Sequence, residues 1–278
     1  MVNYKWFDHI VKIAFCQNPR KISALSCFGP GGEQVCGIPV WAQERSAPLP
    51  GRPEGVSTLC AGDALGMTTS GVLDDEALQL ALKDASVKGK LSLAYLDLTE
   101  ITSEQATRVR AGAPNITELD LRSNNLTDLP DELGDLKALR VIKLDYNKLE
   151  HLPAMLTKLP RLTNLQMGGN LLSTVDASVA ELRALTDLDL SGNRLITVDP
   201  AIARCEKLVY LNLENNMLTA LPPEIGSMEN LRVLDLSNCQ LATLPDTVSG
   251  LVSLTRLEVN NNMLKTLPPS MGRLENLK

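Results

Sequence analysis

Hydrophobic residues recur at a fixed period of 23 residues from residue 93 to the end of the chain. The first aliphatic residue of each unit lies at Leu93, Ile116, Leu139, Leu162, Leu185, Leu208, Leu231, Leu254 and Leu277. Each unit follows LxxLxLxxNxLxxLPxxLxxL, as in LVYLNLENNMLTALPPEIGSMENL at 208–231. Such strict self-similarity is typical of a solenoid, in which each repeat adds one coil and contacts only its neighbours.

The LxLxx stretch of each unit predicts a short β-strand. Alternate residues of an extended segment face opposite sides, so the two leucines point inward and the residues beside them point outward. One strand per coil, stacked about 4.8 Å apart, makes a parallel sheet over a continuous leucine core. The predicted fold is therefore an α/β solenoid with one parallel sheet along its length.

The second half of each unit predicts the return path on the convex side. Proline suits the first position of a helical turn because its φ angle is fixed. The two apolar residues of xxLxxL then mark one side of a short helix or 3₁₀ turn. In two units Val175-Asp176 and Val198-Asp199 replace Leu-Pro. We expect a slightly different convex surface there, without a break in the solenoid.

A polar position recurs inside this apolar frame at the ninth residue of the unit. A buried polar side chain is tolerated only when it is hydrogen-bonded, and Asn can both donate to and accept from the backbone of adjacent coils. We expect a structural ladder of inward side chains at Asn124, Asn147, Asn170, Asn193, Asn216, Cys239 and Asn262.

Cys239 stands where this frame has Asn, in LDLSNCQLATLP at 234–245. Cysteine is small and readily buried, so we interpret Cys239 as an inert structural substitute. The alternative, a reactive thiol, needs exposure and nearby positive charge, and the surrounding residues suggest neither.

These motifs resemble leucine-rich repeats of the 23-residue LPxxL type. They are similar to the repeats of intracellular Ras-group proteins, such as Scribble, Erbin and the plant intracellular Ras-group-related proteins. The resemblance covers residues 93–278, as one degenerate unit followed by seven full repeats. It implies a curved solenoid, a horseshoe with the parallel sheet on its concave side and short helical or 3₁₀ turns on its convex side. Such solenoids are used for contacts between proteins, often in signalling scaffolds, and the resemblance is more specific for fold than for function.

The segment before the repeats has the pattern of an amphipathic helix that begins at Asp74 and ends at Gly89. Its apolar face would hold Leu78, Ala81, Leu82 and Ala85. We assign residues 71–92 to an N-terminal capping helix, because the first coil of a solenoid needs a cover. A membrane-surface helix is the alternative, although the polar face lacks an excess of Lys and Arg.

The two end coils depart from the frame. The first unit keeps the strand pattern from Leu93 but has Ile101 in the Asn slot, so we expect a transitional repeat. At the other end, Leu277 begins a further unit and no polar closing helix follows. We expect the core of the last coil to be exposed, including Leu257, Val259 and Leu264.

Residues 1–70 differ from the repeats in composition. They hold both tryptophans, all three phenylalanines and stretches rich in Gly and Pro such as SAPLPGRPEG. An irregular or disordered leader is predicted, and Pro50 and Pro53 form a PxxP that fits a Src-homology-type domain. Lys5, Asp8 and Lys12 interrupt any secretory signal. An organelle transit peptide is the alternative to a cytoplasmic chain.

Charge and chemistry narrow the function further. Residues 1–70 carry 6 basic and 5 acidic side chains, which leaves 21 basic and 28 acidic for residues 71–278. An acidic body disfavours nucleic acid as a partner, because phosphate binding needs clustered Lys and Arg. No apolar run reaches the roughly 18 residues of a membrane span. The six cysteines and two histidines lack ligand spacing, so we expect no metal, no cofactor and no enzyme.

The outward strand residues form the candidate binding face. Their three columns hold eight acidic and three basic residues, and Tyr146 and Tyr210 are the only aromatics of the seven full repeats. Aromatic anchors ringed by charge are typical of interface hot spots. We select as candidate partner-binding residues Glu118, Asp120, Lys143, Asp145, Tyr146, Asp187, Asp189, Tyr210, Glu214, Asp235, Arg256 and Glu258.

These predictions favour a non-enzymatic protein–protein interaction scaffold in intracellular signalling, which binds a partner with a basic surface on its acidic concave face. Two alternatives stay open at this point. The chain is the recognition fragment of a larger repeat-containing enzyme, such as a kinase or a ubiquitin ligase, or it belongs to an immune-type sensor. The sequence leaves the oligomeric state open.

Overall fold

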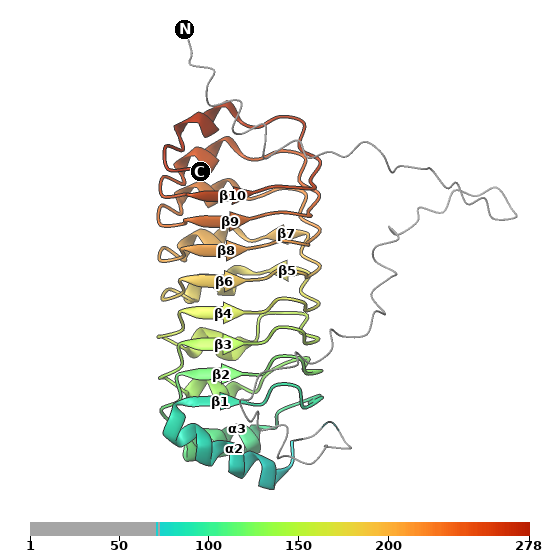
Figure 1. The fold of residues 1–278 in the computed structure, drawn as a ribbon, viewed down its shortest axis with the longest axis vertical. Helices are drawn as coiled ribbons and strands as arrows, with labels where there is room; N and C mark the ends of the chain where they lie inside the picture. Colours follow the sequence, from blue (N-terminus) through green and yellow to red (C-terminus); the bar gives the residue numbers. More distant parts are fainter. Residues whose placement is uncertain (1–70, 72) are drawn as a thin grey trace, which may run out of the picture.

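Residues 73–278 fold as a single stack of coils with a main parallel sheet along its length (Figure 1). The computed structural model describes residue 71 and residues 73–278. The predictions for residues 1–70, including the irregular leader and its PxxP, lie outside these described residues. The fold within 73–278 is the predicted solenoid, with short strands on one side and mostly 3₁₀ turns on the other.

The main sheet has eight strands in the order β1-β2-β3-β4-β6-β8-β9-β10. From β2 onward each strand covers the first apolar residue of LxLxx and its two neighbours, and neighbouring strands pair at a separation of one repeat, as Leu188 pairs with Leu211. The strands are β1 (Lys90–Ser92), β2 (Glu118–Asp120), β3 (Val141–Lys143), β4 (Asn164–Gln166), β6 (Asp187–Asp189), β8 (Tyr210–Asn212), β9 (Val233–Asp235) and β10 (Arg256–Glu258).

Five-residue 3₁₀ helices form the return side of the seven full repeats. They are η4 (Asp131–Asp135), η5 (Ala154–Lys158), η6 (Ala177–Glu181), η7 (Pro200–Arg204), η8 (Pro223–Ser227), η9 (Asp246–Gly250) and η10 (Pro269–Arg273). In five repeats the proline of Leu-Pro lies directly before the helix, where the missing N–H costs no hydrogen bond.

The two repeats without Leu-Pro form a small second sheet. β5 (Thr174–Val175) and β7 (Thr197–Val198) pair in parallel beside the main sheet (Figure 1). Asp176 and Asp199 then take the position of the proline, and their carboxylates accept hydrogen bonds from the N–H groups of Ser178 and Ala201. This is the local change without a break that the sequence predicts.

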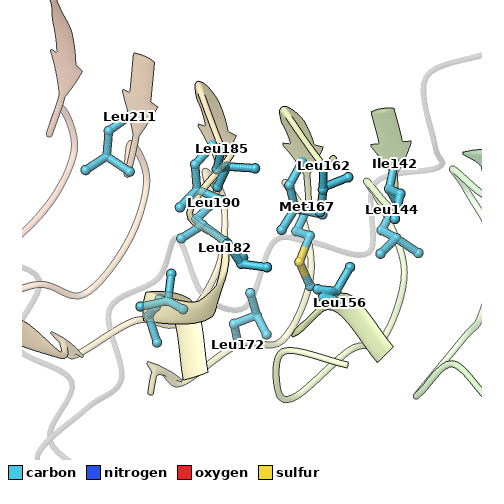
Figure 2. Packing of buried hydrophobic residues seen from close by; sticks show 14 of the residues in the cluster. Ile142, Leu144, Leu156, Leu162, Met167, Leu172, Leu182, Leu185, Leu190 and Leu211 are labelled. Carbon is cyan, nitrogen blue, oxygen red and sulfur yellow. The ribbon is translucent and has the colours of Figure 1, made fainter. Parts of the chain in front are cut away.

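Leucines from both sides of each coil fill the space between the sheet and the 3₁₀ helices (Figure 2). Leu165, Leu211 and Leu234 from the strands are fully buried. Leu156, on η5, and Met167, just after β4 of the next repeat, point into the same core (Figure 2). The core is continuous along the stack, so each coil depends on its two neighbours for burial.

Asparagine side chains connect the coils inside this core. Asn170 Nδ2 donates to the carbonyl oxygens of Leu144 at 2.9 Å and Met167 at 3.0 Å, and Asn170 Oδ1 accepts from the N–H of Leu149 at 3.1 Å. The same pattern recurs at Asn124, Asn147, Asn193, Asn216 and Asn262. The inward Asn residues thus hydrogen-bond backbone groups that have turned away from the sheet.

Cys239 occupies its slot with weaker bonds. Its thiol donates to the carbonyl oxygens of Leu213 at 3.4 Å and Ser237 at 3.7 Å. Burial raises the pKa of this thiol, and nearby backbone N–H groups offset the rise only in part. Burial also raises the pKa of Cys205, to about 11. Both thiols are therefore protonated at neutral pH, as expected of structural cysteines.

Restoring the ladder should stabilise the protein. In the Cys239→Asn variant the new amide can repeat the hydrogen bonds of Asn216, because the neighbouring coils already accommodate Asn. We expect the free energy of unfolding to rise by about 1 kcal/mol, measured as a higher midpoint in urea. A lower midpoint would show that the coil has repacked around sulfur.

The N-terminal end begins with α2 (Asp75–Lys88), whose predicted face is buried against the first coil. Gly89 ends the helix in the left-handed region, at φ 69°, and donates to the carbonyl oxygen of Ala85. Asp74 lies at the N-cap, where the sequence pattern places the start of the helix. Its side chain makes no capping hydrogen bond, and its backbone carbonyl accepts the first helical hydrogen bond, from the N–H of Leu78.

The first coil is longer than the 23-residue frame predicts, and the placement of Ile101 in the Asn slot is wrong. β1 pairs Leu91 with Leu119, and the N–H of Leu96 bonds to Asn124 Oδ1 across 28 residues. The extra length accommodates α3 (Ser103–Gly112), a 10-residue α-helix where later coils have a five-residue 3₁₀ helix. Ile101 lies instead in the apolar core.

The last coil is better covered than predicted. Leu257 and Val259 are only 6% and 7% exposed, so the expectation that both are exposed is wrong. Leu264 and Leu267 are partly buried and pack against the same core. Met271 and Leu274, on the return side, are also buried, so the partial exposure falls on the segment between β10 and η10.

Candidate protein-interaction surface

The sheet face opposite the 3₁₀ helices presents the outward strand residues in straight rows. Parallel register places Asp187, Tyr210 and Val233 side by side on β6, β8 and β9. The same register places Asp189, Asn212 and Asp235 in the next row. Neighbouring strands lie about 4.8 Å apart, so side chains in one row touch or nearly touch.

Acidic residues at the N-terminal part of this face are neutralised. Glu118 accepts from Lys90 at 2.7 Å and from Lys143 at 2.6 Å, and Asp120 pairs with Arg122 at 2.7 Å. Burial acts to raise the pKa of Glu118, but the hydrogen bonds from the two lysines outweigh it and hold the pKa below its usual value. The charged side chains at this end of the face therefore satisfy one another.

The same holds at the C-terminal end, where Arg256 and Glu258 form an ion pair on β10. Arg256 is exposed and Glu258 partly buried. An exposed pair of this kind contributes little to stability. Because its two charges cancel, it adds little net charge to this end of the face.

The acidic residues in the middle have no such partner. Within residues 73–278, none of them lies within ion-pair distance of a Lys or Arg side chain. We call them the central acidic patch, and it consists of Asp145, Asp187, Asp189, Glu214 and Asp235. The charge that the sequence spreads over the whole face is thus concentrated between β3 and β9.

Uncharged donors hold these carboxylates in place. Asp189 accepts from the N–H of Ser191 at 2.9 Å, and Asp235 accepts from the N–H of Ser237 at 2.9 Å. Asp145 accepts from the N–H of Gly168 at 2.9 Å. Each group is therefore oriented while its negative charge stays uncompensated, which is the arrangement that attracts a cationic partner.

Tyr210 lies in the middle of the patch. Its ring is partly buried, and burial raises the pKa of its hydroxyl, with Asp189 and Asp235 adding to the rise. Burial likewise raises the pKa of Asp145, and the charge of Asp189 contributes in the same direction. Both pKa shifts come mainly from burial, and the neighbouring negative charges add a smaller contribution.

Tyr146 lies at the edge of the patch, beyond the end of β3. Its backbone is in the left-handed region, at φ 57°, and its side chain is 58% exposed. Tyr95 takes the same position in the first coil, at φ 62°, and is 65% exposed. The sequence frame missed Tyr95, because it assigned the strand to later residues. The Leu91-x-Leu93 alternation is the signal that locates it.

Metal ligation and membrane crossing find no support in the described part of the chain. Among the residues that the structure describes, no three His, Cys, Asp or Glu side chains gather as metal ligands. Over the same residues, no helix has both the length and the apolar character to cross a membrane.

The fold and this face define a repeat solenoid with one open sheet surface. The chain is a leucine-rich repeat protein. The family described as "Leucine rich repeat" matches residues 114–172 and 184–205, and the "Leucine-rich repeat region" family matches residues 200–278. These family matches do not test the relation to the LPxxL proteins of the intracellular Ras group, which stays a prediction.

Solved structures agree on the fold. A leucine-rich repeat protein of Leptospira interrogans is 34% identical with a TM-score of 0.66, over 74% of this chain and 50% of that one. An internalin of Listeria monocytogenes shares 20% identity with a TM-score of 0.53, over 74% of this chain and 63% of that one. The second likeness concerns the fold alone.

A curated relative is dynein regulatory complex subunit 7 of Chlamydomonas reinhardtii. It is 39% identical over 83 residues, which are 30% of this chain and 7% of that protein. The chain therefore matches only a small part of this relative, and half of the length of the Leptospira protein.

Proposed function

We propose that this chain is a non-enzymatic protein-interaction scaffold, and that the central acidic patch binds a basic surface of its partner. The observation that carries the proposal is the distribution of charge. Five carboxylates without a basic partner among the described residues lie together on one rigid face, whereas the other acids of that face form ion pairs within it.

Two physical effects favour such binding: charge complementarity and a small loss of conformational entropy. Strand residues are fixed by the sheet, so binding orders few side chains and loses little entropy. An unpaired acidic face also steers a basic partner and rejects an acidic one. Tyr210 and the partly exposed Val233 provide apolar area inside the charged ring, as in interface hot spots.

The cellular setting is part of the proposal. We place the chain in the cytoplasm and in intracellular signalling, following its likeness to intracellular Ras-group repeats. A second setting, a subunit of a dynein regulatory assembly, is favoured by the relative of that name, which is 39% identical over 83 residues. A recognition part of a larger kinase or ubiquitin ligase, or of an immune-type sensor, would use the same face.

Charge reversal tests the surface. We expect the Asp189→Lys and Asp235→Lys double variant to lose at least about ten-fold in affinity for a partner captured by the full chain, because like charges then face each other. The matched control is Glu224→Lys with Glu229→Lys, which changes net charge equally at two exposed residues on the return side. Circular dichroism checks that both variants fold.

The control variant shows whether binding depends on the central acidic patch or only on the net charge of the chain. Equal loss in both double variants would attribute binding to overall charge alone. Retention of all partners by the Asp189 and Asp235 variant would place the interaction elsewhere on the chain and overturn the proposal. Glu258 is left unchanged, because its carboxylate is paired with Arg256.

A further inference from the structure

Three glycines lie at one edge of the central acidic patch, beside the exposed ring of Tyr146. Gly168, Gly169 and Gly192 lie just beyond β4 and β6, where the strands turn away from the sheet. We call these three residues the glycine platform. Tyr146 from the neighbouring coil borders it on one side.

Close contact fixes the ring against the platform. A Cβ atom at Gly169 would lie 2.7 Å from Cδ1 and 3.0 Å from Cε1 of Tyr146, so a side chain at residue 169 would displace the ring from its present position. At Gly192 a Cβ would lie 3.4 Å from the backbone nitrogen of Gly169, which places the two glycines side by side. The Tyr146 ring thus packs against Gly169, while the residue remains more than half exposed.

Two carboxylates lie beside the same platform. Asp145 accepts from the N–H of Gly168, and a Cβ at Gly168 would lie 3.3 Å from Asp145 Oδ1. Asp189 stands on β6, close enough for its charge to act on Asp145. Neither carboxylate forms an ion pair with a described residue. The edge therefore combines an exposed aromatic residue with two carboxylates that lack an ion-pair partner among the described residues.

We infer that this edge receives an arginine side chain of the basic partner, with the guanidinium against the Tyr146 ring and hydrogen-bonded to Asp145. The inference rests on the proposed function and specifies the chemistry of its ligand. A planar guanidinium stacks on an aromatic ring and donates in a fork to a carboxylate, whereas the lysine ammonium is a strongly hydrated point charge.

The test compares two probes of equal charge on the full chain. Fluorescence anisotropy measures the binding of a short arginine–glycine repeat peptide and of its lysine–glycine counterpart. We expect the arginine peptide to bind about five-fold more tightly. Tyr146→Asn should abolish this preference, since Asn occupies the same left-handed position at residues 215, 238 and 261 and so preserves the backbone.

Tyr95→Asn is the matched control. It removes an equally exposed tyrosine from the same backbone position, away from the acidic patch, and should leave the preference unchanged. Asp189→Asn should weaken both peptides.

Equal affinities for the two peptides in the unaltered chain would overturn the arginine inference while leaving the proposed acidic surface intact. If neither peptide binds, or if Asp189→Asn binds both as tightly as the unaltered chain, the inference and the peptide-binding role of the patch fail together.

Discussion

Asn170→Ala is expected to lower the free energy of unfolding by about 3 kcal/mol. The N–H of Leu149 bonds to Asn170 Oδ1 inside the core, and alanine leaves this donor buried without its partner. An orphaned buried donor costs about 1–3 kcal/mol, and the bonds to Leu144 and Met167 are lost as well. Urea unfolding measured by circular dichroism gives the change in midpoint.

Neighbouring Asn side chains of the ladder donate to the same carbonyl oxygen, so we expect their effects on stability to be coupled. The carbonyl oxygen of Leu144 accepts from both Asn147 and Asn170, so either single variant leaves it one bond. The double alanine variant removes both, and its destabilisation should exceed the sum of the single effects. Asn115→Ala, at an exposed residue, should change stability by less than about 0.5 kcal/mol. Equal effects at Asn115 and Asn170 would contradict a hydrogen-bonded ladder.

The ladder and the strands could be predicted because they follow from local period. Alternation within LxLxx sets which residues face inward, and the 23-residue spacing sets which of them stack. The seven full repeats obey both rules, so strands β2 to β10 of the main sheet lie where the frame places them. The structure adds the bonding partners, which spacing alone does not name.

The first coil could not be placed from period, since α3 lengthens it. KLSLAYLDL offers leucines at several alternating positions, and the 23-residue frame, extended back from Ile116 to Leu93, chose the wrong set. The correct set depends on the helix that follows. The error removed Lys90 and Tyr95 from the predicted face.

The position of the unpaired acids could not be predicted either, because it depends on the register of the first coil. Lys90 pairs with Glu118 across neighbouring strands, and Lys143 reaches the same carboxylate from the other side. Composition counts all acids of the face alike, whereas the structure separates neutralised ends from an unpaired centre. Which carboxylates form the candidate site is therefore a property of register and side-chain reach.

Gly226→Ala should be among the most damaging substitutions on the convex side, for a reason that sequence spacing conceals. A Cβ atom at Gly226 would lie 2.0 Å from the backbone carbonyl oxygen of Thr247 in the next coil, far inside contact distance. Because the obstacle is backbone, the two 3₁₀ helices must move apart. Overpacking of this kind costs about 1–3 kcal/mol and sometimes more.

Gly272 supplies the matched control at the same repeat position, two coils further along. A Cβ there meets nothing within 4 Å, and Ala in place of Gly reduces the entropy of the unfolded chain. Gly272→Ala should therefore be neutral or stabilise by up to about 1 kcal/mol, while Gly226→Ala lowers the urea midpoint. Opposite signs at two equivalent glycines can arise only from the contact between coils. If both variants unfold at the midpoint of the unaltered chain, η8 and η9 do not pack as closely as the structure places them.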